Sequence, residues 1–365
     1  MPVAPNPAAL PPPQLPPLHL QIATAISWLL FSRIYGIPPR TRLQQTVSTC
    51  PFKMGSTSED PERDSKAGSG ETNADVIARL ERAVEDIGKI HALCNVPSIS
   101  FGVLHQGEII FRRSIGMRDV EKQLPATPST LYPLGSVSKT FLSAALGVAA
   151  DDGKLHWSST LADFVEGFHP QGDEAIATAE ITEFMRHTSG LGCPQVMVIG
   201  PNGVLLSGED REKGIVDLLN EAPTTDAENQ QRLGECFQYN NLAYGLVGMA
   251  LQDAYGMRYS GFLREHILYP LGMHQTATSR TEVSGDAEVA HTYCQVKEGD
   301  GFRRLPFQLT DERNTPILAA MGIRSSVNDM LQWAAAILSA ESCENVENEE
   351  NDNEENDNEE NDNEE

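Results

Sequence analysis

Hydrophobic positions between residues 76 and 150 predict a helix, a β-hairpin and a second helix, in that order. Apolar residues of Val76–Ile90 recur at the spacing of an amphipathic helix. Two β-branched runs follow, Ile99–Leu104 and Glu108–Phe111, and the Gln106-Gly107 pair between them is typical of a tight turn. Phe141–Ala150 is an apolar run of helical length. A sheet with helices packed against it is therefore expected.

Later in the chain the pattern predicts further helices. Asp151–Gly153 is a turn signal that ends the apolar helix. Helices are predicted over Glu209–Glu221, Leu242–Ala250 and Asn328–Leu338. The first two of these indicate a helical lobe inserted in a sheet domain. The polar stretch around Lys297–Gly299 is typical of a hairpin turn.

The first 73 residues differ from the rest in composition and are expected to be a disordered extension. Residues 1–17 are proline-rich and are expected to be extended. Leu18–Ile37 is the most apolar stretch, and a membrane anchor there stays an alternative. Polar interruptions and the lack of a basic region before it argue against an anchor. Met54 is an alternative to Met1 as the start of translation.

Much of the excess negative charge comes from the end of the chain. The formal net charge is −25, and residues 341–365 hold 14 acidic side chains and no Lys or Arg. The repeated Glu, Asp and Asn predict a disordered, solvated tail, which leaves a folded domain over 74–340. No basic stripe is present, which argues against nucleic-acid binding. The carboxylates lack EF-hand spacing, which argues against a strong calcium site.

Six cysteines are spread along the chain without a pairing motif. They form no Cys-x-x-Cys pair and no histidine cluster accompanies them, so no metal site is expected. Scattered cysteines in a chain of 365 residues are typical of reduced thiols, which favours a cytoplasmic location. The cysteines are Cys50, Cys94, Cys193, Cys236, Cys294 and Cys343.

The candidate chemistry begins with Ser136 and Lys139, three residues apart at the start of the apolar helix. Residues at this spacing lie on one helix face, so the lysine amine is expected within hydrogen-bond reach of the serine hydroxyl. A serine is a poor nucleophile until a base takes its proton, and a lysine serves only when neutral. The Ser136 backbone N–H is free there to bind an oxyanion. The alternative, a solvated lysine near a helix start, is disfavoured by the hairpin before the pair and the apolar helix after it.

A second group of polar residues stands before the apolar run Leu242–Ala250. Tyr239 is a candidate proton shuttle for a serine–lysine pair. Asn241 is a candidate ligand for a substrate carbonyl or for the lysine. The alternative is a buried aromatic beside a helix N-cap at Asn240 or Asn241. The two interpretations are compatible with each other.

These motifs resemble those of the serine β-lactamase and penicillin-binding-protein superfamily, in its class C and D-aminopeptidase-like branch, which includes esterases and acyltransferases. That branch carries Ser-x-x-Lys, then Tyr-x-Asn, then a late Lys-Thr-Gly or His-x-Gly. Other strings between about residues 76 and 340 resemble the family in the same order. They are Gly116–Asp119, Pro125–Thr130, Asp152–Leu155, Ile181–Leu191, Tyr269–Met273 and Met321–Asp329.

The resemblance implies a role for each motif residue. Ser136 matches the acylated nucleophile and Lys139 the base or proton relay beside it. Tyr239 matches the general base of the class C branch and Asn241 the substrate-orienting asparagine; which of Lys139 and Tyr239 takes the serine proton is left open. His187 matches a position that is usually structural. The implied fold is α/β (α+β) of the β-lactamase/transpeptidase type, an antiparallel sheet flanked by helices plus a helical lobe, and it needs no cofactor.

The chain departs from the family pattern after the helix predicted over Asn328–Leu338. No Lys-Thr-Gly, Lys-Ser-Gly or His-x-Gly follows it, and the acidic repeat begins soon after Ala340. In the family this region supplies inner strands of the sheet, a second oxyanion N–H and part of the substrate wall. We therefore expect a member that is truncated at its C-terminus, with these strands missing.

The resulting prediction is a serine hydrolase or acyltransferase that acts on a small-molecule ester, amide or β-lactam-like substrate through an acyl-enzyme on Ser136. Acyl transfer in natural-product biosynthesis is one form of this activity. The alternative is a catalytically silent, truncated β-lactamase-like protein with a binding role or none. The two retained motifs favour the enzyme, and the missing third motif favours the alternative. Neither the substrate nor the oligomeric state follows from the sequence.

Overall fold

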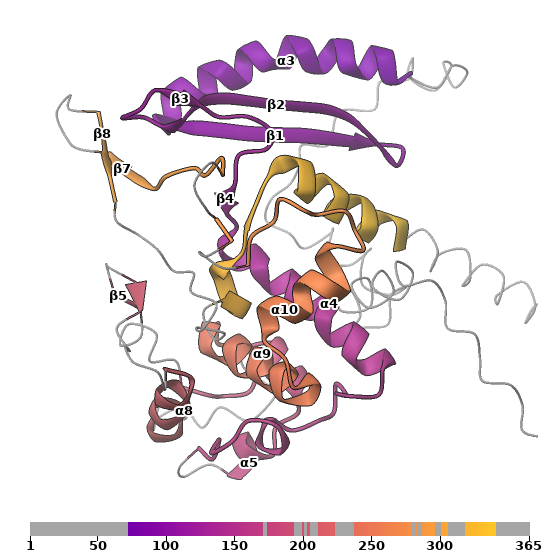
Figure 1. The fold of residues 1–365 in the computed structure, drawn as a ribbon, viewed down its shortest axis with the longest axis vertical. Coiled ribbons are helices and arrows are strands. Elements are labelled where there is room, and N and C mark those ends of the chain that lie inside the picture. The colour runs from indigo at the N-terminus through magenta and orange to yellow at the C-terminus, as the bar shows by residue number, and fades with distance from the viewer. Residues whose placement is uncertain are drawn as a thin grey trace, which may run out of the picture.

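The computed structural model describes residues 72–170, 174–192, 199–200, 203–204, 211–222, 237–278, 282–283, 287–295, 301–305 and 318–340. Within these residues the structure combines small antiparallel sheets with helices, which confirms the predicted fold class. Figure 1 shows the largest sheet under a long helix, with a group of helices on its other side. Almost all of the predicted extension over 1–73, and the whole of the predicted tail over 341–365, lie outside the described residues, so both stay predictions.

The helix predicted first is α3 (Asn73–Cys94). It begins with a capping box, in which the side chains of Thr72 and Asp75 each accept from the other residue's backbone N–H. This arrangement satisfies N–H groups that a helix start otherwise leaves without a partner. The helix ends at Asn95, which has a left-handed backbone conformation.

The predicted hairpin is confirmed as strands β1 (Ser98–His105) and β2 (Glu108–Asp119), which pair antiparallel. Gln106 and Gly107 form the turn, with φ of 50° and 79°. A two-residue turn with positive φ at both positions matches the twist of the strands it joins. Strand β2 is longer than the sequence predicted, because it continues along β1 and then pairs with the short β3 (Leu124–Pro125).

Alternate residues of the hairpin take opposite faces of this sheet. On one face, Arg113 forms an ion pair with Glu81 of α3. On the other face, Ser100 Oγ donates to the Tyr132 hydroxyl at 3.2 Å, and Gly102 lies against Leu331 of a helix over residues 327–340. Helices therefore cover both faces of the sheet (Figure 1).

The helical lobe is built around α4 (Ser138–Asp151) and α9 (Asn241–Tyr255), which pack against each other in the main hydrophobic core. Both helices are apolar around most of their circumference, as expected for helices buried on several sides. Phe141 of α4 stacks on Trp333 of the helix over 327–340, with ring centroids 4.2 Å apart. This stack joins the lobe to the layer beside the sheet.

Shorter elements complete the described part of the chain. The helix predicted over Glu209–Glu221 is confirmed as α8 (Arg211–Glu221). The other helices and helical turns are α5 (Glu174–Ala177), α6 (Ile181–Met185), α10 (Tyr259–Leu263), η2 (Gly135–Val137), η3 (Leu161–Asp163), η4 (Arg264–Leu268) and η5 (Leu318–Gly322). The other strand pairs are β4 (Tyr132–Pro133) with β9 (Arg324–Ser325), β5 (Ile199–Gly200) with β6 (Gly203–Val204), and β7 (Tyr293–Gln295) with β8 (Phe302–Arg304). The turn predicted around Lys297–Gly299 lies outside the described residues, between β7 and β8.

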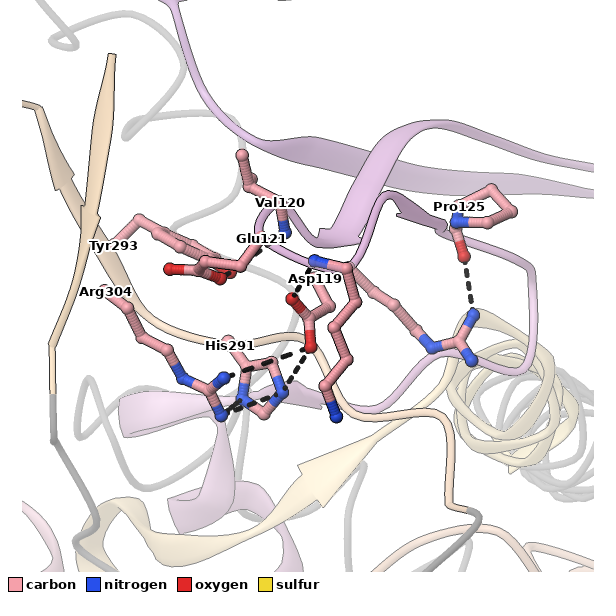
Figure 2. Close-up of polar contacts among 9 residues, drawn as sticks. Asp119, Val120, Glu121, Pro125, His291, Tyr293 and Arg304 are labelled. Carbon is pink, nitrogen blue, oxygen red and sulfur yellow. Dashed lines mark hydrogen bonds and ion pairs between the residues drawn. The ribbon is translucent and has the colours of Figure 1, made fainter. Parts of the chain in front are cut away.

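A buried carboxylate, Asp119, fastens the β7–β8 pair to the end of β2 (Figure 2). Its oxygens accept from the backbone N–H of Lys122 at 3.0 Å and lie 3.4 Å from His291 Nε2 and 3.9 Å from Arg304 Nη1. Burial raises the pKa of Asp119, but these partners lower it by more, and the net shift is downward. The Tyr293 hydroxyl adds a second link, because it accepts from Val120 N–H at 2.9 Å.

None of the helices that the structure describes is both long enough and apolar enough to cross a membrane. The stretch considered as an anchor, Leu18–Ile37, lies outside the described residues. Residues after Ala340 also lie outside them, so the expected loss of C-terminal strands stays a prediction.

Replacing Gly102 by alanine tests the contact between the sheet and the helix over 327–340. A Cβ atom there would lie 2.6 Å from Leu331 Cδ1 and 2.9 Å from the carbonyl oxygen of Phe111. We expect Gly102→Ala to lower the free energy of unfolding in urea by about 1–3 kcal/mol. Gly88→Ala is the matched control, because nothing lies within 4 Å of a Cβ there, and it should raise stability by up to about 1 kcal/mol. Equal effects of the two changes would contradict the packing.

Candidate active site

Ser136 lies in the 3₁₀ turn η2, directly before α4, and its side chain is exposed. Its Oγ is 2.6 Å from the hydroxyl of Tyr239, which is itself 43% exposed. The sequence had predicted a hydrogen bond from Ser136 to Lys139. Among the hydrogen bonds of the described residues, Ser136 Oγ instead pairs with Tyr239. Both residues of this pair are therefore exposed to solvent.

Lys139 is buried beneath this pair, with only 7% of its surface exposed. Its Nζ donates to Asn241 Oδ1 at 2.5 Å and to the carbonyl of Ala320 at 2.8 Å. The amine also lies 4.8 Å from the ring centre of Tyr239 and 5.1 Å from that of Tyr244, within cation–π range. Burial lowers the pKa of Lys139, and Tyr239 raises it by less, so the net shift is downward. Neutral amine is therefore more abundant here than in a solvated lysine.

Asn240 caps helix α9, and Asn241 binds Lys139; the sequence left open which of the two residues is the cap. Asn240 is the N-cap of α9, and its Oδ1 accepts from the N–H groups of Leu242 and Ala243 at 2.9 and 3.2 Å. Its Nδ2 donates to the carbonyls of Leu191 and Gly192. Asn241, the first residue of the helix, turns to Lys139. Adjacent residues at a helix start point in different directions, so one caps the helix and the other binds the lysine.

The segment Leu318–Ser325 contributes to the site through backbone groups. Besides the Ala320 carbonyl, the Ile323 N–H donates to Ser138 Oγ at 3.1 Å, and the Ile323 carbonyl accepts from Leu134 N–H at 2.9 Å. These bonds hold the residues on both sides of Ser136. Met321–Asp329 resembles the family, but Ala320 just before it was not among the residues predicted for the site, because a backbone acceptor leaves no signature in the residue type.

His187 has the structural role that the resemblance implied, in that it is 8% exposed and its Nδ1 accepts from the backbone N–H of Asn240 at 3.0 Å. Burial, with a smaller contribution from the charge of Lys139, lowers the pKa of His187 to about 4. The imidazole is therefore neutral at physiological pH. It lies beside the Tyr239–Asn241 segment and supports it.

Within the described residues, no group of three or more His, Cys, Asp or Glu side chains is placed to hold a metal ion. Cys94 and Cys294 are described, and both are free. The other four cysteines, Cys50, Cys193, Cys236 and Cys343, lie outside the described residues. The four residues proposed from the sequence, Ser136, Lys139, Tyr239 and Asn241, do meet at one place, through the hydrogen bonds given above.

Comparison with known proteins agrees with this geometry. A sequence model of the family described as Beta-lactamase matches residues 80–363. Protein flp of Staphylococcus aureus (strain MW2) is 25% identical over 189 residues, which cover 51% of this chain and 36% of that protein. Penicillin-binding protein 4* of Bacillus subtilis (strain 168) is 26% identical over 223 residues, which cover 60% of this chain and 45% of that protein. The chain spans less than half the length of these curated relatives.

Solved structures show the same relationship. The octameric penicillin-binding protein homologue from Pyrococcus abyssi superimposes with a TM-score of 0.57 and 26% identity, covering 70% of this chain and 55% of that one. A class C beta-lactamase superimposes with a TM-score of 0.55 and 21% identity, covering 73% of this chain and 65% of that one. This match shows that the two proteins have a similar fold. Because the family model matches well over half of the chain, this protein belongs to the beta-lactamase family, within the superfamily of serine β-lactamases and penicillin-binding proteins.

Proposed function

We propose that this chain is a serine hydrolase or acyltransferase that forms an acyl-enzyme on Ser136. The family consists of serine hydrolases, among them β-lactamases and penicillin-binding proteins. The observation that carries the proposal is the 2.6 Å hydrogen bond between Ser136 Oγ and the Tyr239 hydroxyl, with the Lys139 amine 4.8 Å from the centre of the same ring. An exposed candidate nucleophile and an exposed candidate proton acceptor meet here, with a buried amine beside the acceptor.

Tyr239 and Lys139 act in this proposal as a pair that shares one proton. In one arrangement the tyrosine is a phenol and the lysine a neutral amine; in the other they are phenolate and ammonium. The two arrangements differ only in the position of one proton, so the net charge of the pair is the same in both. In the second arrangement Tyr239 is the immediate acceptor for the Ser136 proton, and the ammonium stabilises the phenolate.

Acylation follows from this arrangement. Ser136 Oγ attacks the carbonyl carbon while Tyr239 takes its proton, and a tetrahedral intermediate forms. In this proposal the Ser136 backbone N–H donates to the oxyanion, as N–H groups at a helix start are free to do. Tyr239 then gives the proton to the leaving nitrogen or oxygen as its bond to carbon breaks, which leaves the acyl group on Ser136. Asn241 holds Lys139 and orients the substrate.

Deacylation repeats these steps with a new nucleophile. Water or another hydroxyl or amine attacks the acyl carbonyl, Tyr239 takes its proton, and the proton returns to Ser136 Oγ as the ester bond breaks. Water gives hydrolysis, and another acceptor gives acyl transfer, as in natural-product biosynthesis. The proposed substrates are small-molecule esters, amides and β-lactams; the names of the penicillin-binding relatives support the last class.

Labelling with a fluorophosphonate, which reacts with activated serines, tests the nucleophile. Intact-mass analysis should show one adduct on the wild-type protein and none on Ser136→Ala. Ser114→Ala is the matched control and should label as the wild type does, because Ser114 Oγ pairs with Ser100 in the sheet at 2.8 Å. An adduct that survives on Ser136→Ala would refute the assignment. No adduct on folded wild-type protein would favour a silent protein with a binding role.

The pH dependence of labelling tests the proton pair. The rate should rise with pH as the pair loses a proton, with a midpoint below 10.5, the ordinary lysine pKa. Lys139→Met should slow labelling by about 100-fold or more and remove this rise. Lys89→Met is the control, because Lys89 is an exposed lysine on α3 that pairs with Asp86. It should change neither the labelling rate nor its rise with pH. A rate that falls through the same pH range would mean that the proton-rich pair is the reactive form, contrary to the proposal.

A further inference from the structure

We propose that His187 is a positioning residue, whose neutral imidazole holds the segment that carries Tyr239 and thereby sets the position of the proton acceptor for Ser136. The effect on reaction rate rests on the proposed function. The hydrogen bond and the charge state of His187 do not, and they are tested separately below.

Two hydrogen bonds tie the segment to His187 on both sides of Tyr239. The carbonyl of His187 accepts from Gln238 N–H at 2.7 Å, and its Nδ1 accepts from Asn240 N–H at 3.0 Å. Backbone N–H groups two residues apart point the same way in an extended segment, so one residue is able to bind both. Tyr239 stands between the two anchored positions, and its backbone therefore has little freedom to move.

The imidazole also packs against two aromatic rings of the site. Its ring centroid lies 4.5 Å from that of Tyr239 and 4.9 Å from that of Tyr244. These are the two rings over which the Lys139 amine lies, at 4.8 and 5.1 Å. His187 and Lys139 thus both pack against the rings of Tyr239 and Tyr244. A shift of the His187 ring would therefore move the Tyr239 ring relative to the Lys139 amine.

The backbone of His187 is held in an uncommon conformation, with φ of 60°. Residues other than glycine rarely adopt a left-handed backbone, which persists where surrounding contacts determine it. Here those contacts are the two bonds to Gln238 and Asn240 and the burial of the ring. The energetic cost of the left-handed backbone at His187 is offset by the hydrogen bonds to Gln238 and Asn240 that this conformation allows.

The hydrogen bond to Asn240 also determines the charge of His187. An Nδ1 that accepts from an N–H group carries no proton, so the neutral ring has its proton on Nε2. A second proton on Nδ1 would face the Asn240 N–H, donor against donor. Among the described residues, the charged or titratable groups recorded around the ring are Lys139 from α4, Tyr239 from the adjacent segment and Tyr244 from α9, whose pKa burial raises. The Lys139 ammonium disfavours an imidazolium, and a negative charge on Tyr239 in the proposed pair is balanced by that ammonium.

Nitrogen chemical shifts of ring-labelled histidine measure this state directly. The His187 signals, assigned by their absence in His187→Asn, should show the Nε2–H tautomer and a titration near pH 4. A titration near 6.5, the unperturbed value, or a proton on Nδ1 would overturn the proposal. This measurement does not depend on whether Ser136 reacts.

Two substitutions separate the hydrogen bond from the ring. His187→Asn places an amide oxygen on Cγ, where Nδ1 was; asparagine tolerates positive φ and does not titrate. His187→Phe keeps an aromatic ring but has no acceptor. At pH 7 we expect the maximal rate of fluorophosphonate labelling of His187→Asn to be within about threefold of the wild-type rate. The maximal rate for His187→Phe should be lower by about 10- to 100-fold, with little change in affinity for the probe.

The acid side of the pH profile gives a further readout. Below the midpoint of the Lys139–Tyr239 pair, labelling should slow with falling pH in both the wild type and His187→Asn. Near pH 4 the wild type should fall more steeply than His187→Asn, because only the wild type also protonates His187; circular dichroism at each pH identifies loss of fold. A His187→Phe variant that is labelled as fast as the wild type, or a His187→Asn variant that falls as steeply as the wild type near pH 4, would overturn the proposal. If the wild type is not labelled at all, the proposed function fails, and the histidine shifts alone decide the role of His187.

Discussion

The buried amine of Lys139 is the constraint on which the arrangement of the helical lobe depends. An amine or ammonium taken out of water needs hydrogen-bond partners, because an unpaired buried charge costs several kcal/mol (about 3–5 when one partner is removed). Its partners are Asn241, the first residue of α9, and the carbonyl of Ala320 in η5. Helices α4 and α9 and the η5 turn must therefore meet at one point. One side chain links three segments that are far apart in the sequence.

The same meeting point positions Ser136. Ile323, just after η5, binds Ser138 on one side of the nucleophile and Leu134 on the other. The neighbouring strand β9 then pairs with β4, which leads into the turn that holds Ser136. Phe141 and Trp333 join α4 to the helix that covers the sheet. Ser136 is thus fixed by contacts with the sheet layer as well as by its own helix.

Burial separates the two exposed groups that are proposed to meet the substrate from the groups beneath them. Lys139, Asn241 and His187 are almost fully buried, while Ser136 and Tyr239 are exposed. Buried groups lose little entropy when a substrate binds, because packing and hydrogen bonds already restrict them. The low dielectric beneath Tyr239 also strengthens the effect of the lysine charge on it.

The sequence by itself determined the secondary structure around the site and the identity of its side chains. Helix α3, the β1–β2 hairpin and α4 follow from local hydrophobic spacing and from Gln106 and Gly107, because each depends on neighbouring residues. Ser136, Lys139, Tyr239 and Asn241 were found from short motifs for the same reason. Only the tertiary structure decided that Tyr239 binds Ser136, that Asn240 caps α9 while Asn241 binds Lys139, and that Ala320 supplies a carbonyl. The bonds of Tyr239, Asn241 and Ala320 join residues more than 100 positions apart, and the Ala320 bond uses a backbone group that every residue has, so no local pattern could reveal them.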